Sequence, residues 1–293
     1  MTYSSRLFRR GLLAVALSIA SVSAGAHQET PADNSWWWDN DWWFEGRLSQ
    51  PVNHPVRTEE ISYQSEDVDV PALLARPDDD REYPAVLFVH GRRGLDDLVQ
   101  LHVKRLAARG FVVLAPDLFT GRFIEKFPIE HDYAVEKDAA AGLDRLLGLP
   151  GISGDKACLY SHTRGGYITL KVAVAEARQG KQAACYVSYY PHMQDPNAPE
   201  PMQVYRHAPE ADELTIPALI FIGEDEQYQR RRSIESAVSS LQDLDRPVRL
   251  IVYPGVGRGF DFREERVRTF ADDLASKDAI QRAADFMRAH LKD

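Results

Sequence analysis

The sequence contains little cysteine and no excess of basic residues. Only Cys158 and Cys185 are present among 293 residues, and the formal net charge is −9. Two distant cysteines exclude a disulfide framework or a zinc ribbon. The negative charge disfavours nucleic acid and anionic membrane surfaces as partners, because both attract basic proteins. No histidine pair has metal-ligand spacing with a matching carboxylate, so we expect no metal and no other cofactor.

The first residues have the pattern of a signal peptide. Three arginines precede an apolar run at residues 11–24, and Ala24-Gly25-Ala26 fits a cleavage site. An uncleaved membrane anchor is the alternative, but the run is short for a span of about 20 residues. We therefore expect residues 1–26 to be removed and the protein to be periplasmic or secreted.

Residues 27–56 form a second zone, a tryptophan-rich arm followed by a linker. The segment from Trp36 to Phe44 holds all five tryptophans. Because indoles are costly to expose, the arm either packs into grooves of the following domain or forms an aromatic patch that binds a protein partner, a glycan or a lipid. The sequence does not separate these alternatives.

Strands alternate with helices from residue 57 to the C-terminus. Continuous apolar runs, typical of buried parallel strands, occur at residues 83–90, 111–116, 157–161, 183–190, 218–222 and 248–253. Apolar stripes predict helices at residues 95–106, 133–147, 165–178 and 280–291, and two edge strands are expected at residues 60–65 and 68–76. This alternation predicts an α/β fold with a mostly parallel sheet. The proline-rich connection 191–216 is predicted to be a functional lid or a disordered insert.

A sharp turn between an apolar strand and a helix is the most informative segment. It reads Ser161-His-Thr-Arg-Gly-Gly166. The form small-x-Thr-x-Gly-Gly is that of a nucleophile elbow, in which small flanking residues allow a strained strand-to-helix turn. Thr163 stands where such an elbow carries Ser or Cys.

The order of these segments resembles the dienelactone hydrolase family of α/β-hydrolases, from about Glu59 to Lys292. The resemblance rests on the elbow and on five further segments, which are Ala75–Pro77, His90–Leu95, Arg109–Leu118, Ile216–Asp225 and Tyr253–Phe260. It implies an α/β-hydrolase fold over residues 57–293, a mostly parallel central sheet flanked by helices. The implied family activity is hydrolysis of small esters or lactones.

The family uses a triad of Cys or Ser, His and Asp. Carried over by position, the nucleophile falls on Thr163, the acid on Glu226 or its neighbour Asp225, and the base on Arg258. Threonine is a nucleophile only when a base removes its proton. Arginine stays protonated and cannot be that base. The triad is therefore expected to lack its proton relay.

The resemblance also implies an oxyanion hole built from the backbone N–H groups of Arg164 and of Gly91 or Arg92. Side chains of Arg92, Arg93, Arg164 and Arg258 would surround its mouth. Converging arginines and a helix N-terminus predict an anion site. The alternative is that some of them point outward and that Arg258 pairs with one of the two acids.

Two histidines are candidates for a replacement base. His192 follows a strand end and could face the cleft, whereas His162 is expected to be a packed or surface histidine. We therefore expect a catalytically degenerate protein that binds a small ligand, including an anionic one, or a protein partner. The alternatives are a hydrolase that activates Thr163 with a non-standard base, and a structural envelope component that contacts partners through the tryptophan-rich arm.

Both cysteines fall on strands that would be neighbours in this fold. An exported protein can form a disulfide there. Bonding across adjacent buried strands is geometrically demanding, so Cys158 and Cys185 are expected to be two buried thiols.

Overall fold

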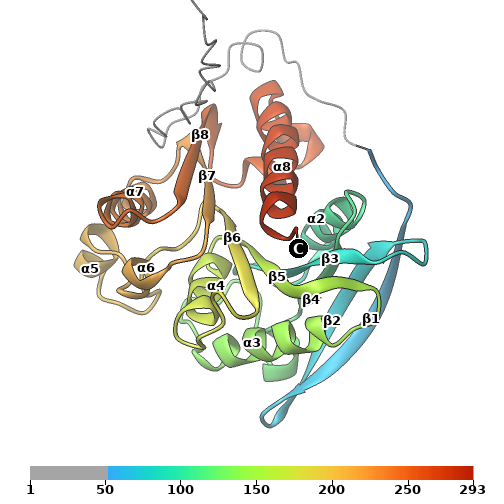
Figure 1. Cartoon of the computed structure of the whole chain (residues 1–293). Helices are drawn as coiled ribbons and strands as arrows, with labels where there is room; N and C mark the ends of the chain where they lie inside the picture. Colours follow the sequence, from blue (N-terminus) through green and yellow to red (C-terminus); the bar gives the residue numbers. More distant parts are fainter. Residues whose placement is uncertain (1–51, 293) are drawn as a thin grey trace, which may run out of the picture. The chain divides into compact units, whose positions relative to one another are not determined.

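The computed structural model describes residues 52–292, and Figure 1 shows a twisted sheet in this range with helices on both faces. Eight strands follow the order β1-β2-β4-β3-β5-β6-β7-β8. The pairs β1–β2 and β2–β4 are antiparallel, and all other pairs of this sheet are parallel. The α/β prediction is confirmed. The predicted signal peptide, residues 1–26, and the aromatic segment Trp36–Phe44 lie outside the described residues.

The elements alternate along the chain as the apolar runs predict. The strands are β1 (Val56–Ser65), β2 (Val68–Pro77), β3 (Tyr83–Val89), β4 (Val112–Pro116), β5 (Ile152–His162), β6 (Ala183–Tyr189), β7 (Ala218–Asp225) and β8 (Val248–Gly257). The helices are α2 (Asp97–Ala107), α3 (Ala134–Leu147), α4 (Gly165–Ala173), α5 (Glu200–Tyr205), α6 (Glu210–Glu213), α7 (Tyr228–Asp243) and α8 (Phe270–His290). Three short 3-10 turns are η1 (Thr120–Arg122), η2 (Phe260–Phe262) and η3 (Glu265–Val267).

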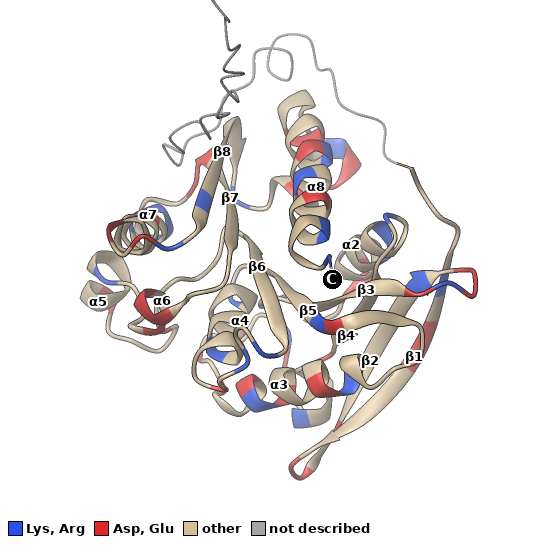
Figure 2. Ribbon diagram, viewed as in Figure 1, with Lys and Arg blue, Asp and Glu red and all other residues tan. Residues whose placement is uncertain are grey.

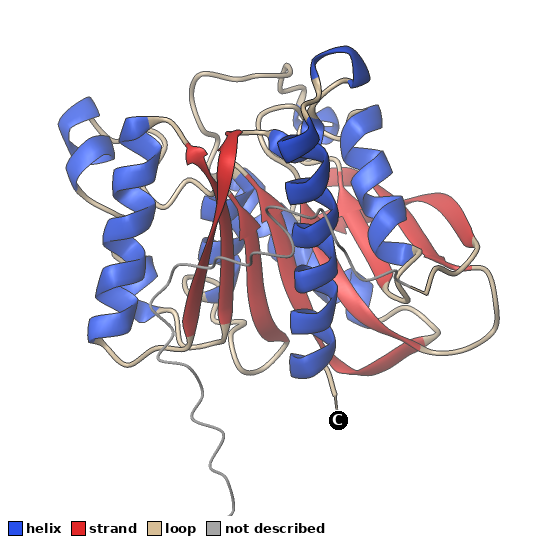
Figure 3. Cartoon of the chain, turned by 90° about the horizontal axis from the view of Figure 1, so that it is seen from above, coloured by secondary structure: helices blue, strands red, loops and turns tan. Residues whose placement is uncertain are grey.

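Helices cover both faces of the sheet, which explains why its central strands are apolar along their length. In Figures 1 and 3, α2 and α8 lie on one face, and α3, α4 and α7 lie on the other. Strands β4 and β6 are almost wholly buried. Charged residues of both signs gather on helices such as α3 and α8 (Figure 2). Within residues 52–292, no helix combines the length and the apolar character that a membrane crossing requires.

The connection from Pro191 to Ile216 is not the structureless insert that its sequence suggests. It contains α5 and α6, and α5 packs against α7. Met193, Ala208 and Leu214 are buried in the core. Several prolines separate these apolar residues, so the stretch has no helical or strand periodicity. The burial of these residues could therefore not be predicted from the sequence pattern. Helix α7 is missing from the sequence-based prediction, although its buried apolar residues Ile234, Ala237, Val238 and Leu241 follow helical spacing.

A disulfide joins β5 to β6, so the expectation of two buried thiols is wrong. Cys158 and Cys185 are paired directly in the register of the two parallel strands. Their Cα atoms are 4.7 Å apart, within the range of about 4.4–6.8 Å that disulfides accept. The sequence places the two cysteines on neighbouring strands but does not fix the register, which decides whether they meet.

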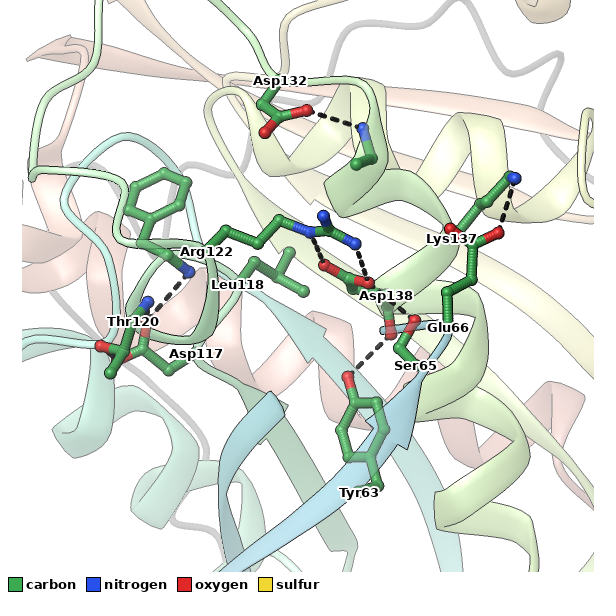
Figure 4. Close-up of polar contacts among 12 residues, drawn as sticks. Tyr63, Ser65, Glu66, Asp117, Leu118, Thr120, Arg122, Asp132, Lys137 and Asp138 are labelled. Atoms are coloured by element: carbon green, nitrogen blue, oxygen red, sulfur yellow. Dashed lines mark hydrogen bonds and ion pairs between the residues drawn. The ribbon is translucent and has the colours of Figure 1, made fainter. Parts of the chain in front are cut away.

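A buried carboxylate fastens the β1–β2 hairpin to α3 and to the chain after β4 (Figure 4). Asp138 accepts hydrogen bonds from Ser65 Oγ at 2.7 Å and from Arg122 Nη2 at 2.8 Å, and its own carbonyl accepts one from Tyr63 Oη at 2.7 Å. The carboxylate is almost wholly buried, and Arg122 supplies the opposite charge that burial requires. This cluster fixes the start of the 117–133 connection, which passes beside the candidate site.

Candidate functional site

Thr163 lies at the tip of a tight turn between β5 and α4. Its φ angle is 50°, in the left-handed region, which is a strained conformation for a β-branched residue. The Thr163 carbonyl accepts hydrogen bonds from the backbone N–H of Gly166 at 3.0 Å and of His192 at 2.8 Å. The predicted elbow therefore has the strained strand-to-helix geometry that places a side chain at the carboxyl edge of a parallel sheet.

Two glycines allow α4 to begin directly against the neighbouring backbone. A Cβ on Gly165 would lie 2.4 Å from the carbonyl oxygen of Val89, and one on Gly166 would lie 2.4 Å from Cβ of Pro191. Neither contact leaves room for a side chain. These are the two positions that the elbow pattern reserves for small residues.

The Thr163 hydroxyl lies directly over the turn that follows β3. A Cβ on Gly91 would lie 1.7 Å from Thr163 Oγ1. Neither the backbone N–H of Arg92 nor that of Arg164 has a hydrogen-bond acceptor among the described residues. The predicted oxyanion segments thus meet at the hydroxyl, with backbone donors left available.

Arg258 and Glu226 come together as a buried ion pair. Arg258 follows β8, Glu226 follows β7, and Arg258 Nη1 donates to Glu226 Oε1 at 2.9 Å. The Glu226 side chain is fully buried. Arg258 also lies over the ring of Tyr190, with Cζ 5.1 Å from the ring centroid. Asp225 is exposed, so Glu226 is the acid that the structure brings to the predicted base position.

A cavity of about 240 Å³ connects these residues. Thr163, Arg258 and Tyr190 line it, together with Arg93 and Arg263. The Thr163 hydroxyl makes no hydrogen bond to a described residue, so none of these residues accepts its proton in this arrangement.

Arg92 and Arg164, which are predicted to bind an anion, donate instead to backbone carbonyls of this chain. Arg92 donates to the carbonyls of Phe127 and Pro128 at 2.7 and 2.8 Å. Arg164 donates to the carbonyls at residues 129 and 130 at 2.8 and 2.9 Å. Four successive carbonyls of the 117–133 connection are thus held by the two arginines that flank Gly91 and Thr163. Their guanidinium groups add positive charge to the site without forming a carboxylate pair.

The region around Thr163 holds more guanidinium groups than carboxylates. Burial, reinforced by neighbouring arginines, lowers the pKa of Arg164 to about 10 and that of Arg230 to about 10. Burial also lowers the pKa of His192 well below its usual value, and Arg258, Arg230, Arg164 and Arg92 lower it further. His192 is therefore neutral, and its Nδ1 is buried without a hydrogen-bond partner. Arg230 is not among the residues that the sequence predicts for this site, because the helix that carries it, α7, is not predicted either.

A second polar cluster lies beneath the elbow. His162 Nε2 is 2.7 Å from Asp261 Oδ2, and His102 Nε2 is 3.0 Å from the Asp261 carbonyl oxygen. The Tyr190 hydroxyl donates to the other carboxylate oxygen. His162 is thus packed, as predicted, but against a carboxylate that the sequence did not reveal. Asp261 is 99 residues from His162 and 159 from His102, and no spacing pattern connects them.

The ligand atoms of His102, His162 and Asp261 lie within 4.8 Å of one another, close enough to consider a metal. A metal-bound histidine normally donates its second ring N–H to an acceptor. The Nδ1 atoms of both histidines are buried without a hydrogen-bond partner. Their arrangement fits two rings whose Nε2–H groups donate to Asp261 better than it fits two metal ligands.

The topology of the sheet, the elbow after β5 and the backbone donors after β3 define a protein of the α/β-hydrolase class. The sequence model of the "Dienelactone hydrolase family" matches residues 70–291, and the chain belongs to this family. The uncharacterized peptidase YtmA of Bacillus subtilis (strain 168) is 26% identical over 247 residues, which cover 75% of this chain and 93% of that protein.

Two other similarities agree with this assignment. Chlorophyllase type 0 of Chenopodium album is 28% identical over 137 residues, which span 43% of this chain but only 38% of the chlorophyllase. A dienelactone hydrolase-like promiscuous phosphotriesterase from metagenomic libraries superposes with a TM-score of 0.64 at 15% identity, over 81% of this chain and 99% of that one. The structural likeness shows the α/β-hydrolase fold.

The buried histidine cluster predicts a loss of stability in mild acid. Burial lowers the pKa of His102 from 6.5 to about 4, although Asp261 opposes this shift. Between these values the unfolded chain binds the proton and the folded chain does not, so the free energy of unfolding falls as the pH falls through this window. The loss should reach about 3 kcal/mol at 1.36 kcal/mol per pKa unit. Urea unfolding from pH 7 to 4 measures it.

The matched variants are His102→Gln, which keeps an N–H donor for the Asp261 carbonyl, and His207→Gln, which removes a part-exposed histidine. The first should flatten the pH dependence, and the second should retain it. An equal slope in wild type and His102→Gln would contradict the assignment.

Proposed function

We propose that this protein binds a small anionic ligand in the cavity beside Thr163 and does not hydrolyse esters efficiently. The observation that carries the proposal is the Arg258–Glu226 ion pair. A guanidinium has five donors and no lone pair that could accept the Thr163 proton. The pair therefore offers the cavity a fixed positive group in place of a general base.

The surplus of guanidinium groups supports an anion as the ligand. Of Arg92, Arg164, Arg230 and Arg258, only Arg258 donates to a carboxylate among the described residues. Arg258 Nη2 is buried without a hydrogen-bond partner, so it has a donor to offer. Buried charge is stable when it is paired, and an anionic ligand would supply the missing partner.

The alternative is a hydrolase that uses a non-standard base. His192 is a candidate for that base, because its backbone N–H donates to the Thr163 carbonyl and its Nδ1 has no hydrogen-bond partner, although its side chain is not among those that line the cavity. A base works best when its pKa is near the operating pH. The pKa of His192 is well below its usual value because of burial and the surrounding arginines, which makes it a weak proton acceptor.

Ester turnover separates the two alternatives. Wild type should reach at most about 10³–10⁴-fold above the uncatalysed rate, the residual that an oxyanion hole and binding supply without a triad. Thr163→Ala should leave the rate with short-chain activated esters unchanged. The double variant Thr163→Ser with Arg258→His should create turnover, whereas Thr163→Ser alone should not. Turnover in wild type that Thr163→Ala abolishes would refute the binding-only proposal.

Anion binding can be measured without turnover. Thermal shift and calorimetry with carboxylates and phosphates should find a stabilising ligand for wild type. Arg258→Gln removes a guanidinium that lines the cavity and has an unpartnered donor, and it should weaken binding by about ten-fold or more. Hydrogen bonds to charged groups contribute about 1.5–3 kcal/mol, and about 1.4 kcal/mol is tenfold.

The control for this measurement is Arg266→Gln, a largely exposed arginine in η3, which should bind as wild type does. Binding that Arg230→Gln and Arg258→Gln leave unchanged would remove the anion site from the arginine cluster.

We also propose that the chain is exported and loses residues 1–26. The supporting observations are the basic start, the apolar run and the Ala24-Gly25-Ala26 site, together with the Cys158–Cys185 disulfide. Disulfides persist mainly in oxidising compartments. Mass spectrometry of the protein from a bacterial periplasmic fraction, without reductant, should find His27 first and no reactive thiol. Full-length protein with two free thiols in the cytosolic fraction would contradict export.

A further inference from the structure

A groove of about 470 Å³ lies at the sheet edge opposite the elbow. Tyr83 begins β3 and Gly110 precedes β4, and both line the groove, whereas Gly91 and Thr163 follow the carboxyl ends of their strands. Its volume falls in the range of about 300–1,000 Å³ typical of pockets that hold a ligand. The groove is separate from the proposed ligand cavity, and the inference below does not depend on the proposed function.

The groove contains two buried polar atoms without partners. These are Nε of Arg109, at the end of α2, and Oε1 of Gln281, in α8. Buried donors and acceptors are normally satisfied, and each one left unmade costs about 1–3 kcal/mol. An occupant that offers one hydrogen-bond donor and one acceptor would satisfy both atoms.

The charge of the groove is positive. Arg109 and Arg288 both line it. Arg288 pairs with Asp285, but Arg109 donates only to the carbonyl of Arg105. No carboxylate of the described residues makes a hydrogen bond or ion pair with Arg109. A carboxylate on the occupant would supply the acceptor and the opposite charge together.

The described chain begins in this groove. Val52 lines it and is largely exposed. His54 is fixed by a 2.7 Å hydrogen bond from its N–H to the Ala108 carbonyl and by its ring against Tyr83. The described part of the chain therefore starts beside the groove. Phe44 lies eight residues earlier, a reach of at most about 26–29 Å.

The segment Trp36–Phe44 carries the chemistry that the groove lacks. It holds five tryptophans and one phenylalanine, and Asp39 and Asp41 lie between them. An indole N–H is a donor only, which suits Gln281 Oε1. Each aromatic side chain can bury about 150–250 Å². The two aspartates provide carboxylates for Arg109.

We propose that Trp36–Phe44 occupies this groove of its own chain, with an indole N–H donating to Gln281 and an aspartate accepting from Arg109. The segment would then fasten the amino ends of β3 and β4 to the ends of α2 and α8, which lie side by side in Figure 1 and are joined by the hydrogen bond from Arg288 to the Arg109 carbonyl. The aromatic residues would be shielded from water by the domain that follows them.

Tryptophan fluorescence of the full chain tests this inference, because all five tryptophans lie within the segment. The folded protein should show a blue-shifted emission and weak acrylamide quenching relative to the urea-unfolded chain, at all protein concentrations. The double variant Arg109→Met with Gln281→Leu should shift the emission to the red and increase quenching. Arg266→Met with Gln64→Leu makes the same changes at exposed positions and should behave as wild type.

Stability provides a second readout. If the groove were empty, replacing two unsatisfied polar groups with apolar ones should preserve or raise the free energy of unfolding. If the segment occupies it, that free energy should fall. The double variant Asp39→Asn with Asp41→Asn changes no residue of the described domain and should also increase quenching. It therefore tests the inference even if the groove variant folds poorly.

Three results would overturn the inference. Emission of the native protein equal to that of the unfolded chain would show an undocked segment, free for a partner. Shielded emission that the groove variants leave unchanged would place the segment elsewhere. Shielding that disappears on dilution would show docking between two copies.

Discussion

The left-handed turn at Thr163 is the constraint on which the rest of the site depends. It holds a β-branched residue at φ 50° and is stable only because the surrounding structure determines it fully. Gly165 and Gly166 remove the clashes behind the turn, and Gly91 leaves space for the hydroxyl in front of it. The Thr163 carbonyl then fixes His192 through its N–H. One strained residue thereby sets the relative positions of three segments that are distant in sequence, at residues 89–91, 163–166 and 191–192.

The strands, most of the long helices and the elbow could be predicted from the sequence, because each is a local pattern. Buried parallel strands are continuous apolar runs, and the turn needs small residues at fixed offsets. Contacts between segments that are distant in sequence could not be predicted from such local patterns. The disulfide depends on the register of β5 against β6, and the Asp261 cluster depends on where η2 meets α2 and the end of β5. Helices α5 and α6 could not be predicted, because prolines interrupt the apolar periodicity of the connection that contains them. Predicting that Arg258 would meet Glu226 required the positional resemblance to a known family.

The two buried polar clusters around Thr163 differ in charge. Beneath the elbow, burial alone would raise the pKa of Asp261. The combined effect of His162, His102 and the Tyr190 hydroxyl is larger and lowers this pKa below its usual value, so the carboxylate stays ionised. Beside the elbow, one carboxylate, Glu226, accompanies several guanidinium groups. The carboxylate of the first cluster is satisfied by hydrogen bonds from within the chain, which suits a structural support. The second retains unpaired positive charge, which suits a site that receives a ligand.

The arginines that would attract an anion also weaken the best alternative base. Each guanidinium near His192 disfavours its protonated form, so the pKa of His192 falls as the positive field grows. A bound anion would offset that field and move the pKa of His192 back toward its usual value. Proton acceptance by His192 is therefore coupled to the charge of the ligand. A neutral ester would meet a poor base, whereas an anionic substrate would improve the base that acts on it. If His192 acts as the base for Thr163, that chemistry would depend on the anion binding proposed for this site.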